Sequence, residues 1–335
     1  MIIEELLEEA RRRIAVTPEE LAEARRRREL VANALREEFG GRVYFNGSVA
    51  HGDANDPLTD FDIGIVVPDP HGEYGPGLRS SDELKERVRT AVRNALSDEF
   101  PELRVEIEGR KRSVLIRFSD PVSDRTGDLT GDVIVALDHP AEGLYIPRYT
   151  SWDRSHPEKH TELVLDGNDR TRNVLARCNR LLKYWSGRHD DPVCSWHIKV
   201  LALEAIDTPM ALIDALQAFF DHADQALADG DTPDPAGVGP DIVPRVSRSH
   251  ARTRLLAANE NLRGAREDEA NDRPLSAQAK LSNVFPDIVD RPSDEEIADE
   301  ERASELARLR QAANLTGVGV GAGVSIPDTR GWRPE

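Results

Sequence analysis

The spacing of apolar and polar residues changes along the chain and divides it into two parts. In the first 160 residues, short apolar runs rich in β-branched side chains are separated by turn residues, as is typical of strands. Beyond that point, apolar residues recur at helical spacing up to about residue 313. The pattern predicts an α+β protein with a mixed or antiparallel sheet and helices in 1–160, a helical second lobe in 161–313, and a flexible glycine-rich tail in 314–335.

The individual elements follow from the same pattern and from local start and stop signals. Thr17, Pro18 and Glu20 supply a capping residue, a proline in the first turn and the acid of a capping box, so a helix is expected from there to about Glu38. A helix before it and one at 82–96 are also expected. The expected strands are 42–46, 61–67, 103–108, 112–118 and 132–137. The expected helices of the second part are 169–186, 195–206, 209–229, 247–270, 274–284 and 294–313.

A run of four arginines, Arg25 to Arg28, lies inside the helix that starts near Thr17. Charge runs on amphipathic helices usually form the solvated side. We therefore expect these arginines to lie in solvent, opposite an apolar stripe that includes Leu21, Val31 and Leu35. A ligand-binding patch is the alternative interpretation.

Composition and charge narrow the class of protein. With 39% hydrophobic and 32% charged residues, the chain is expected to be a soluble globular protein. No apolar run reaches the roughly 20 residues of a membrane span, and the N-terminus lacks the pattern of a signal peptide. Cys178 and Cys194 form neither a zinc pattern nor a disulfide framework, which favours the reducing cytoplasm.

The net charge of −18 disfavours long nucleic acids as partners, because the general field of the protein repels them. It leaves nucleotides open as ligands, since bound divalent cations reverse the sign of the local field. No membrane partner is expected.

The predicted strand 61–67 carries the most informative charges. Because successive side chains of a strand point to opposite faces, Asp60 and Asp62 share one face, whereas Phe61, Ile63 and Ile65 form an apolar face. Two carboxylates side by side repel each other, and a divalent cation between them converts that repulsion into coordination. Mg²⁺ prefers such hard oxygen ligands, with Mn²⁺ as an alternative ion.

A third carboxylate is available at Asp132, which begins the strand-like run 132–137. If this strand lies beside 61–67, Asp132 joins the other two. Three carboxylates can hold two metal ions about 4 Å apart, an arrangement that serves in-line phosphoryl displacement. Asp128 is a nearby competitor, but Asp132 is preferred because it directly precedes the β-branched residues.

Gly47 and Ser48 follow the first predicted strand and are expected to open a helix. Backbone N–H groups at a helix start, together with a serine hydroxyl, form an anion site, and glycine allows close approach of a phosphate. Strand, Gly-Ser, Asp-x-Asp and a later aspartate on another strand, taken in that order, predict a site for a nucleoside triphosphate.

These residues resemble a known superfamily. "GSVAHGD", "TDFDIGIVV" and "GDVIVAL" are similar to the Gly-Ser, Asp-x-Asp and third-aspartate pattern of polymerase-β-type nucleotidyltransferases. In the second half, "RLLKYW" and "CSWHIKVLALE" resemble the helical lobe of cyclic GMP-AMP synthase, oligoadenylate synthetase and the bacterial cyclic-oligonucleotide synthases, the CD-NTases. The resemblance covers roughly residues 40–290. It implies a polymerase-β-like core and a helical lobe with a central active-site cleft.

The resemblance also implies roles for single residues. It implies that Asp60, Asp62 and Asp132 are catalytic and bind Mg²⁺. It implies nucleotide-binding roles for Gly47, Ser48, Lys183, Ser195 and Trp196, with Trp196 placed where relatives often stack a tyrosine on a base. One departure is Gly52-Asp53, where the family often has Gly-Thr, so the loop on the triphosphate side is not defined by the resemblance.

The implied activity is Mg²⁺-dependent joining of nucleoside triphosphates into a cyclic di- or oligonucleotide second messenger, with release of pyrophosphate. In the bacterial family this activity implies antiphage signalling, a downstream effector that reads the product, and in some cases a regulatory or tail-modifying partner. Two alternatives remain: a nucleotidyltransferase that modifies a tRNA, a protein or a small molecule, and a nucleotide-binding regulator without activity. His156 and His160, four residues apart, are expected to be structural, because no third ligand lies nearby and Pro157 interrupts a helix.

Overall fold

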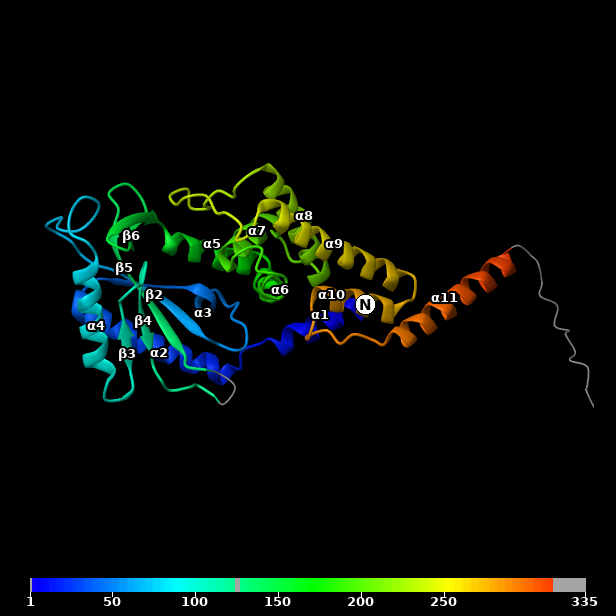
Figure 1. Cartoon of the computed structure of the whole chain (residues 1–335), viewed down its shortest axis with the longest axis horizontal. Coiled ribbons are helices and arrows are strands. Elements are labelled where there is room, and N and C mark those ends of the chain that lie inside the picture. The colour runs from blue at the N-terminus through cyan, green and yellow to red at the C-terminus, as the bar shows by residue number, and fades with distance from the viewer. Residues whose placement is uncertain (1, 124–126, 316–335) are drawn as a thin grey trace, which may run out of the picture.

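The computed structural model describes residues 2–123 and 127–315, which form two lobes (Figure 1). The first lobe is built on a sheet in the order β1 (Arg42–Asn46), β2 (Asp60–Val66), β5 (Thr130–Asp138), β4 (Ser113–Arg117) and β3 (Arg104–Glu106). Strands β2 and β5 are parallel, and their other neighbours are antiparallel. The predicted α+β class with a mixed sheet is confirmed.

The two faces of this sheet differ as the alternation of β2 predicts. Helices α2 (Pro18–Phe39) and α4 (Asp82–Leu96) cover one face, where Phe61, Ile63 and Ile65 are buried in an apolar core. On the other face, Asp60 and Asp62 are only half buried. The short helix α3 (Gly47–His51) connects β1 to the loop before β2. One face therefore supplies stability and the other carries the carboxylates.

The helical lobe has its own apolar core. Leu181, Trp185 and Phe220 are fully buried in it, together with residues of α1. The contributing helices are α1 (Ile2–Arg13), α6 (Val174–Arg188), α7 (Ser195–Ala205), α8 (Leu212–Asp229), α9 (Arg248–Ala270) and α10 (Pro274–Val284). Helix α1 lies beside α10 (Figure 1). The prediction that both N-terminal helices belong to the 1–160 lobe is therefore wrong for α1, because its stripe of Ile3, Leu7 and Ala10 is buried against this second core.

The sequence pattern did not predict three elements: strands β6 (Leu144–Arg148) and β7 (Ser151–Ser155) and helix α5 (Pro157–Arg170). The two strands form a hairpin on the end of β5, and Trp152 is the one apolar residue of β7, so this strand has no apolar alternation to detect. Pro157 does not interrupt a helix; it occupies the first turn of α5, where a proline N–H is not needed. The expected helix at 169–186 is instead α5 ending at Arg170 and α6 starting at Val174.

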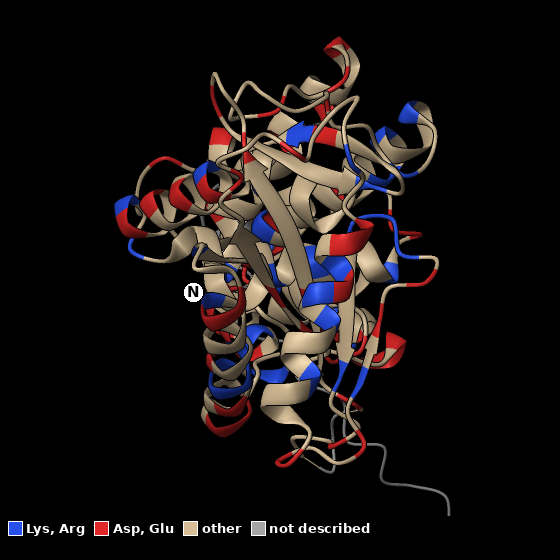
Figure 2. Ribbon diagram, turned by 90° about the vertical axis from the view of Figure 1, so that its left-hand side faces the viewer, with Lys and Arg blue, Asp and Glu red and all other residues tan. Residues whose placement is uncertain are grey.

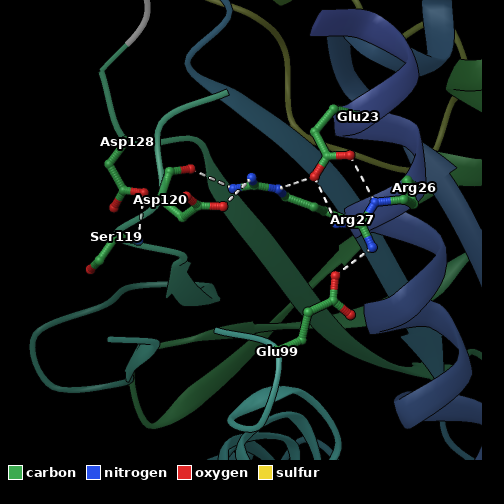
Figure 3. Close-up of polar contacts among 7 residues, drawn as sticks. All are labelled: Glu23, Arg26, Arg27, Glu99, Ser119, Asp120 and Asp128. Carbon is green, nitrogen blue, oxygen red and sulfur yellow. Dashed lines mark hydrogen bonds and ion pairs between the residues drawn. The ribbon is translucent and has the colours of Figure 1, made fainter. Parts of the chain in front are cut away.

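The arginine run of α2 differs from the expected solvated face. Arg27 is buried and its guanidinium lies over the rings of Phe100 and Phe118, with ion pairs to Glu23 and Asp120 at 2.8 and 2.7 Å (Figure 3). Its long side chain covers the edge of the core while its charge is paired at the rim. Arg25 and Arg26 are exposed, whereas Arg28 is half buried with its guanidinium over the ring of Phe45.

Helix α11 (Asp294–Leu315) extends away from the rest of the second lobe (Figure 1). The tail was predicted to span 314–335. Its first two residues belong to α11, and 316–335 lie outside the described residues. Figure 2, viewed from the opposite end of the molecule, where the sheet lobe lies, shows acidic and basic segments alternating along the same helices. Among the described helices, none has the length and apolarity that crossing a membrane requires.

Candidate active site

A cavity of about 800 Å³ lies between the two lobes. Its volume is within the range of pockets that hold small molecules. The sheet lobe contributes β1, α3 and β2, and the helical lobe contributes α6, α7 and the loop between α8 and α9. Of the residues predicted to bind nucleotide or metal, seven line it: Gly47, Ser48, Asp60, Asp62, Lys183, Ser195 and Trp196. The structure thus brings together side chains that are up to 149 positions apart in the sequence, from Gly47 to Trp196.

The register of the sheet places the third carboxylate beside the other two. Asp62 on β2 pairs directly with Asp132 on the parallel strand β5, so both side chains leave the same face. Asp60 is two residues earlier on that face and accepts a hydrogen bond from the Thr59 hydroxyl at 3.2 Å. The expectation that strand 132–137 neighbours strand 61–67 is confirmed.

The three charges affect one another. Burial, reinforced by the charges of Asp60 and Asp132, raises the pKa of Asp62 to about 7. Burial also raises the pKa of Asp60. Carboxylates that face a cavity and resist ionisation are a donor set that suits a divalent cation, because the cation removes the repulsion. Asp60 and Asp62 therefore fit a Mg²⁺ ion.

Asp132 is already engaged by neighbours on its own lobe. Its Oδ1 accepts hydrogen bonds from Ser113 at 2.7 Å and from Arg110 at 2.9 Å. In residues 2–123 and 127–315, no three His, Cys, Asp or Glu side chains are arranged closely enough to form a ready metal cluster. Asp132 therefore adjoins the pair with its Oδ1 engaged by Arg110 and Ser113.

Asp128, the competitor for the third position, lies elsewhere. Its carboxylate accepts a hydrogen bond from the backbone N–H of Ser119 at 2.7 Å, beside Asp120, the ion-pair partner of Arg27 (Figure 3). The strand order thus favours Asp132 over Asp128 as the neighbour of Asp62.

Gly47 and Ser48 open α3, as expected, but the helix has only five residues. The N–H of Gly47 donates to the side chain of Asn46 at 2.8 Å, so this donor is already used. Gly47 has a φ of +74°, and a Cβ built on it would lie 1.7 Å from Oδ2 of Asp62. The glycine is therefore required by the close packing of α3 on the carboxylate, a reason different from the phosphate approach that the sequence indicated.

The opposite wall of the cavity carries the residues from the helical lobe. Lys183 on α6 and Ser195 and Trp196 at the start of α7 all line it. The ring of Trp196 lies 4.4 Å from that of His160. Trp196 is half buried, so one part of the indole is held by His160 while another faces the cavity.

No family model and no curated protein sequence matches the chain. Solved structures match its fold. CdnC of E. coli MS115-1, solved with ATP, superimposes with a TM-score of 0.66 at 17% identity, over 85% of this chain and 98% of that one. The CD-NTase CdnG of Bradyrhizobium diazoefficiens, solved with GTP, gives a TM-score of 0.62 at 14% identity, over 84% and 98%.

The Vibrio cholerae cyclic AMP-GMP synthase DncV, a prokaryotic cGAS homolog, gives a TM-score of 0.60 at 15% identity, over 83% of this chain and 93% of that one. The chain has the bilobed CD-NTase fold. The resemblance inferred from the motifs is therefore confirmed in the architecture, including the helical lobe.

Within this CD-NTase fold, the cavity contains two further residues to which the sequence motifs assigned no ligand-binding role, Lys199 and His160. Lys199 lines it four residues after Ser195, on the same side of α7, so helical spacing was an available signal. His160 also lines it, and its Nε2 lies 2.6 Å from Oδ1 of Asp234. No local pattern links these two, since 74 residues separate them. His160 is therefore structurally held, as expected, but at the edge of the candidate site.

Proposed function

We propose that this chain is a nucleotidyltransferase that joins nucleoside triphosphates into a cyclic di- or oligonucleotide and releases pyrophosphate. The observation that carries the proposal is the cavity itself: Asp60 and Asp62, with Asp132 beside them, face lysines of the other lobe. Carboxylates that hold a cation and lysines that bind phosphate are both needed for a triphosphate. The CD-NTase fold, shared with proteins solved with ATP and with GTP, supports this assignment.

In the proposed reaction, a ribose hydroxyl oxygen of one nucleotide bonds to the α-phosphorus of another. The bond from that phosphorus to the bridging oxygen breaks, pyrophosphate leaves, and the hydroxyl proton ends in solvent. Mg²⁺ held by Asp60 and Asp62, with Asp132, supplies charge stabilisation for this displacement. Ser48 and Lys183 orient the triphosphate from opposite walls, and Trp196 offers an aromatic face to a base.

Incubation of the purified chain with labelled ribonucleoside triphosphates and Mg²⁺, with no acceptor, tests the proposal. We expect pyrophosphate and a nucleotide product that resists phosphatase, because a closed ring has no terminal phosphate. Label that moves only onto an added tRNA, protein or small molecule would support a macromolecule- or drug-modifying enzyme instead. Mass spectrometry of the product identifies the bases.

Magnesium affinity is expected to depend on pH. Because burial and the neighbouring carboxylates raise the pKa of Asp62 to about 7, a proton competes with the cation below that pH. Affinity should rise about tenfold per pH unit up to pH 7 and then level off. Without metal, the folded state holds this proton more tightly than the unfolded chain does, so stability should fall as pH rises from about 4 to 7.

Calorimetric titration of Mg²⁺ in the presence of a non-hydrolysable triphosphate, at several pH values from 5.5 to 8.5, measures the first effect. Thermal melts without metal over pH 4 to 8 measure the second. An affinity that does not change between pH 5.5 and 7 would contradict the assignment of Asp62 as a ligand.

The biological setting is part of the same proposal. CdnC has been solved in a complex with a HORMA protein, and the structural match to the CdnC of that complex covers 83% of this chain. We infer a regulatory partner for this chain as well, together with a downstream effector that reads the product in antiphage signalling. Co-expression of the chain with its genomic neighbours, followed by affinity purification, tests for such a partner.

A further inference from the structure

The loop after α3 holds a buried carboxylate that faces two lysines of the other lobe. Asp53 has no exposed surface. Its Oδ1 lies 3.3 Å from Nζ of Lys183 on α6, and its Oδ2 lies 3.1 Å from Nζ of Lys199 on α7. Lys183 also donates to the backbone carbonyl of Asp53. Both lysines line the cavity, so Asp53 lies behind them and not among the groups that a ligand would contact.

The same loop is tied to α6 on both sides of Asp53. Arg180 donates from Nη2 to the carbonyl of Gly52 at 2.9 Å, and Asn55 donates to the carbonyl of Arg180 at 2.9 Å. Three of four successive loop residues thus bind one helix of the second lobe. The position of the lysines relative to the carboxylate pair is fixed by this loop.

A hydrogen-bonded chain continues from Lys199 to the start of α3. Nζ of Lys199 lies 2.8 Å from Nδ1 of His51, and Nε2 of His51 lies 3.1 Å from the hydroxyl of Thr161. Burial, together with Lys199, lowers the pKa of His51 to about 3, so the ring is neutral and accepts from the lysine. Thr161 in turn donates to Asn46, whose side chain accepts from Gly47.

The charges in this network do not cancel. Two ammonium groups share one carboxylate, and His51 is neutral, so one positive charge remains on the cavity side. Burial lowers the pKa of Lys183 and the carboxylate of Asp53 opposes that shift. An ammonium group buried without a counterion loses its proton readily. The carboxylate of Asp53 therefore favours the charged form of Lys183 and is in direct ionic contact with both lysines.

We propose that Lys199 is a second lysine for the donor triphosphate and that Asp53 positions it together with Lys183. This inference rests on the proposed nucleotidyltransferase function. It explains why an acid occupies the position where the family often has threonine: a neutral side chain there would leave two lysines without their shared counterion. Lys199 contacts the phosphates, whereas Asp53 acts through the lysines and is a positioning residue.

The test is Asp53→Asn in the full chain, with affinity for a non-hydrolysable triphosphate and Mg²⁺ measured by calorimetry from pH 6 to 9. The quantity compared is the ratio of the variant's affinity to that of the unaltered protein, which cancels the titration of the ligand and of Asp62. Asparagine keeps the shape but removes the carboxylate that contacts both lysines, which then face each other, His51 and Arg180, with Asp60 and Asp62 as the acids that remain across the cavity. Because a lysine with a lowered pKa is charged at low pH and neutral at high pH, the ratio should fall about tenfold as pH rises.

Lys199→Met should weaken binding about tenfold at every pH, and Lys199→Arg should restore part of it. Asp268→Asn is the matched control. Asp268 is also buried and also holds two cations, Arg273 at 2.5 Å and Lys280 at 2.5 Å, but none of the three lines the cavity. This variant should lose stability and leave triphosphate affinity and its pH profile unchanged.

The outcomes separate this inference from the proposed function. If the unaltered protein binds triphosphate but Asp53→Asn shows a constant ratio over the pH range, or Lys199→Met binds equally well, the inference is overturned and the function stands. If the unaltered protein binds no triphosphate at any pH, the proposed function is overturned, and the inference with it.

Discussion

Replacing Asp60 and Asp62 together by alanine is expected to lower pyrophosphate release about 1,000-fold or more. The pair is the donor set that fits Mg²⁺, and the charge stabilisation that such an ion supplies amounts to several kcal/mol, each 1.36 kcal/mol corresponding to a factor of ten. The fold should persist, because the pKa of Asp62 near 7 means that the ionised pair opposes folding. A coupled assay for pyrophosphate in Mg²⁺, with circular dichroism and a thermal melt, measures both quantities.

Asp128→Asn is the control for the loss of an acidic charge. Asp128 precedes β5, the strand that contains Asp132, but its carboxylate binds the backbone of Ser119 (Figure 3) and it does not line the cavity. Its variant should keep pyrophosphate release within about twofold, since it has no part in the cavity. If the double variant of Asp60 and Asp62 retains a tenth of the original activity, these residues are not the Mg²⁺ ligands, and the proposed chemistry is contradicted.

Gly47→Ala is expected to reduce activity about 100-fold or more while the sheet and both apolar cores stay intact. The added Cβ would lie 1.7 Å from Oδ2 of Asp62, so the carboxylate or the start of α3 must move. A displacement of about 1 Å in a catalytic group is enough to lower a rate by about two orders of magnitude. Because Asp62 is the group displaced, the apparent affinity for Mg²⁺ should fall in parallel with the rate.

Gly52→Ala separates this effect from backbone strain. Gly52 ends the same helix with a φ of +73°, almost equal to that of Gly47, but a Cβ there meets no atom within 4 Å. Both variants place a side chain in the left-handed region, at a similar cost of about 1 kcal/mol in stability. Gly52→Ala should therefore show that loss in a melt and retain activity within about threefold. Equal activity of the two variants would mean that contact with Asp62 has no functional effect.

Both predictions concern the sheet side of the cavity, while phosphate binding is proposed on the helical side. The loop 52–56 joins the two, since it follows α3 and is bound by Arg180 and Lys183 of α6. A change in the angle between the lobes would alter the distance between Asp62 and the lysines.

Several features of this protein were determined by the sequence alone. The alternation in "FDIGIVV" assigned Asp60 and Asp62 to one face and Phe61, Ile63 and Ile65 to the core, because strand geometry leaves no other choice. The box of Thr17 and Glu20 set the start of α2, since both capping hydrogen bonds are local. Both features depend only on residues within one strand or one helical turn.

Tertiary structure decided what local patterns do not contain. The assignment of α1 to the helical lobe, the contact of Arg27 with Phe100 and the meeting of Asp53 with Lys183 and Lys199 all depend on elements distant in sequence. An amphipathic helix shows which side is buried but not against which core, and a charged side chain shows no partner until the chain is folded. Asp53 is buried between the ammonium groups of Lys183 and Lys199, which come from the other lobe. A buried carboxylate without such partners would be unstable, so the position of Asp53 depends on the docking of the two lobes.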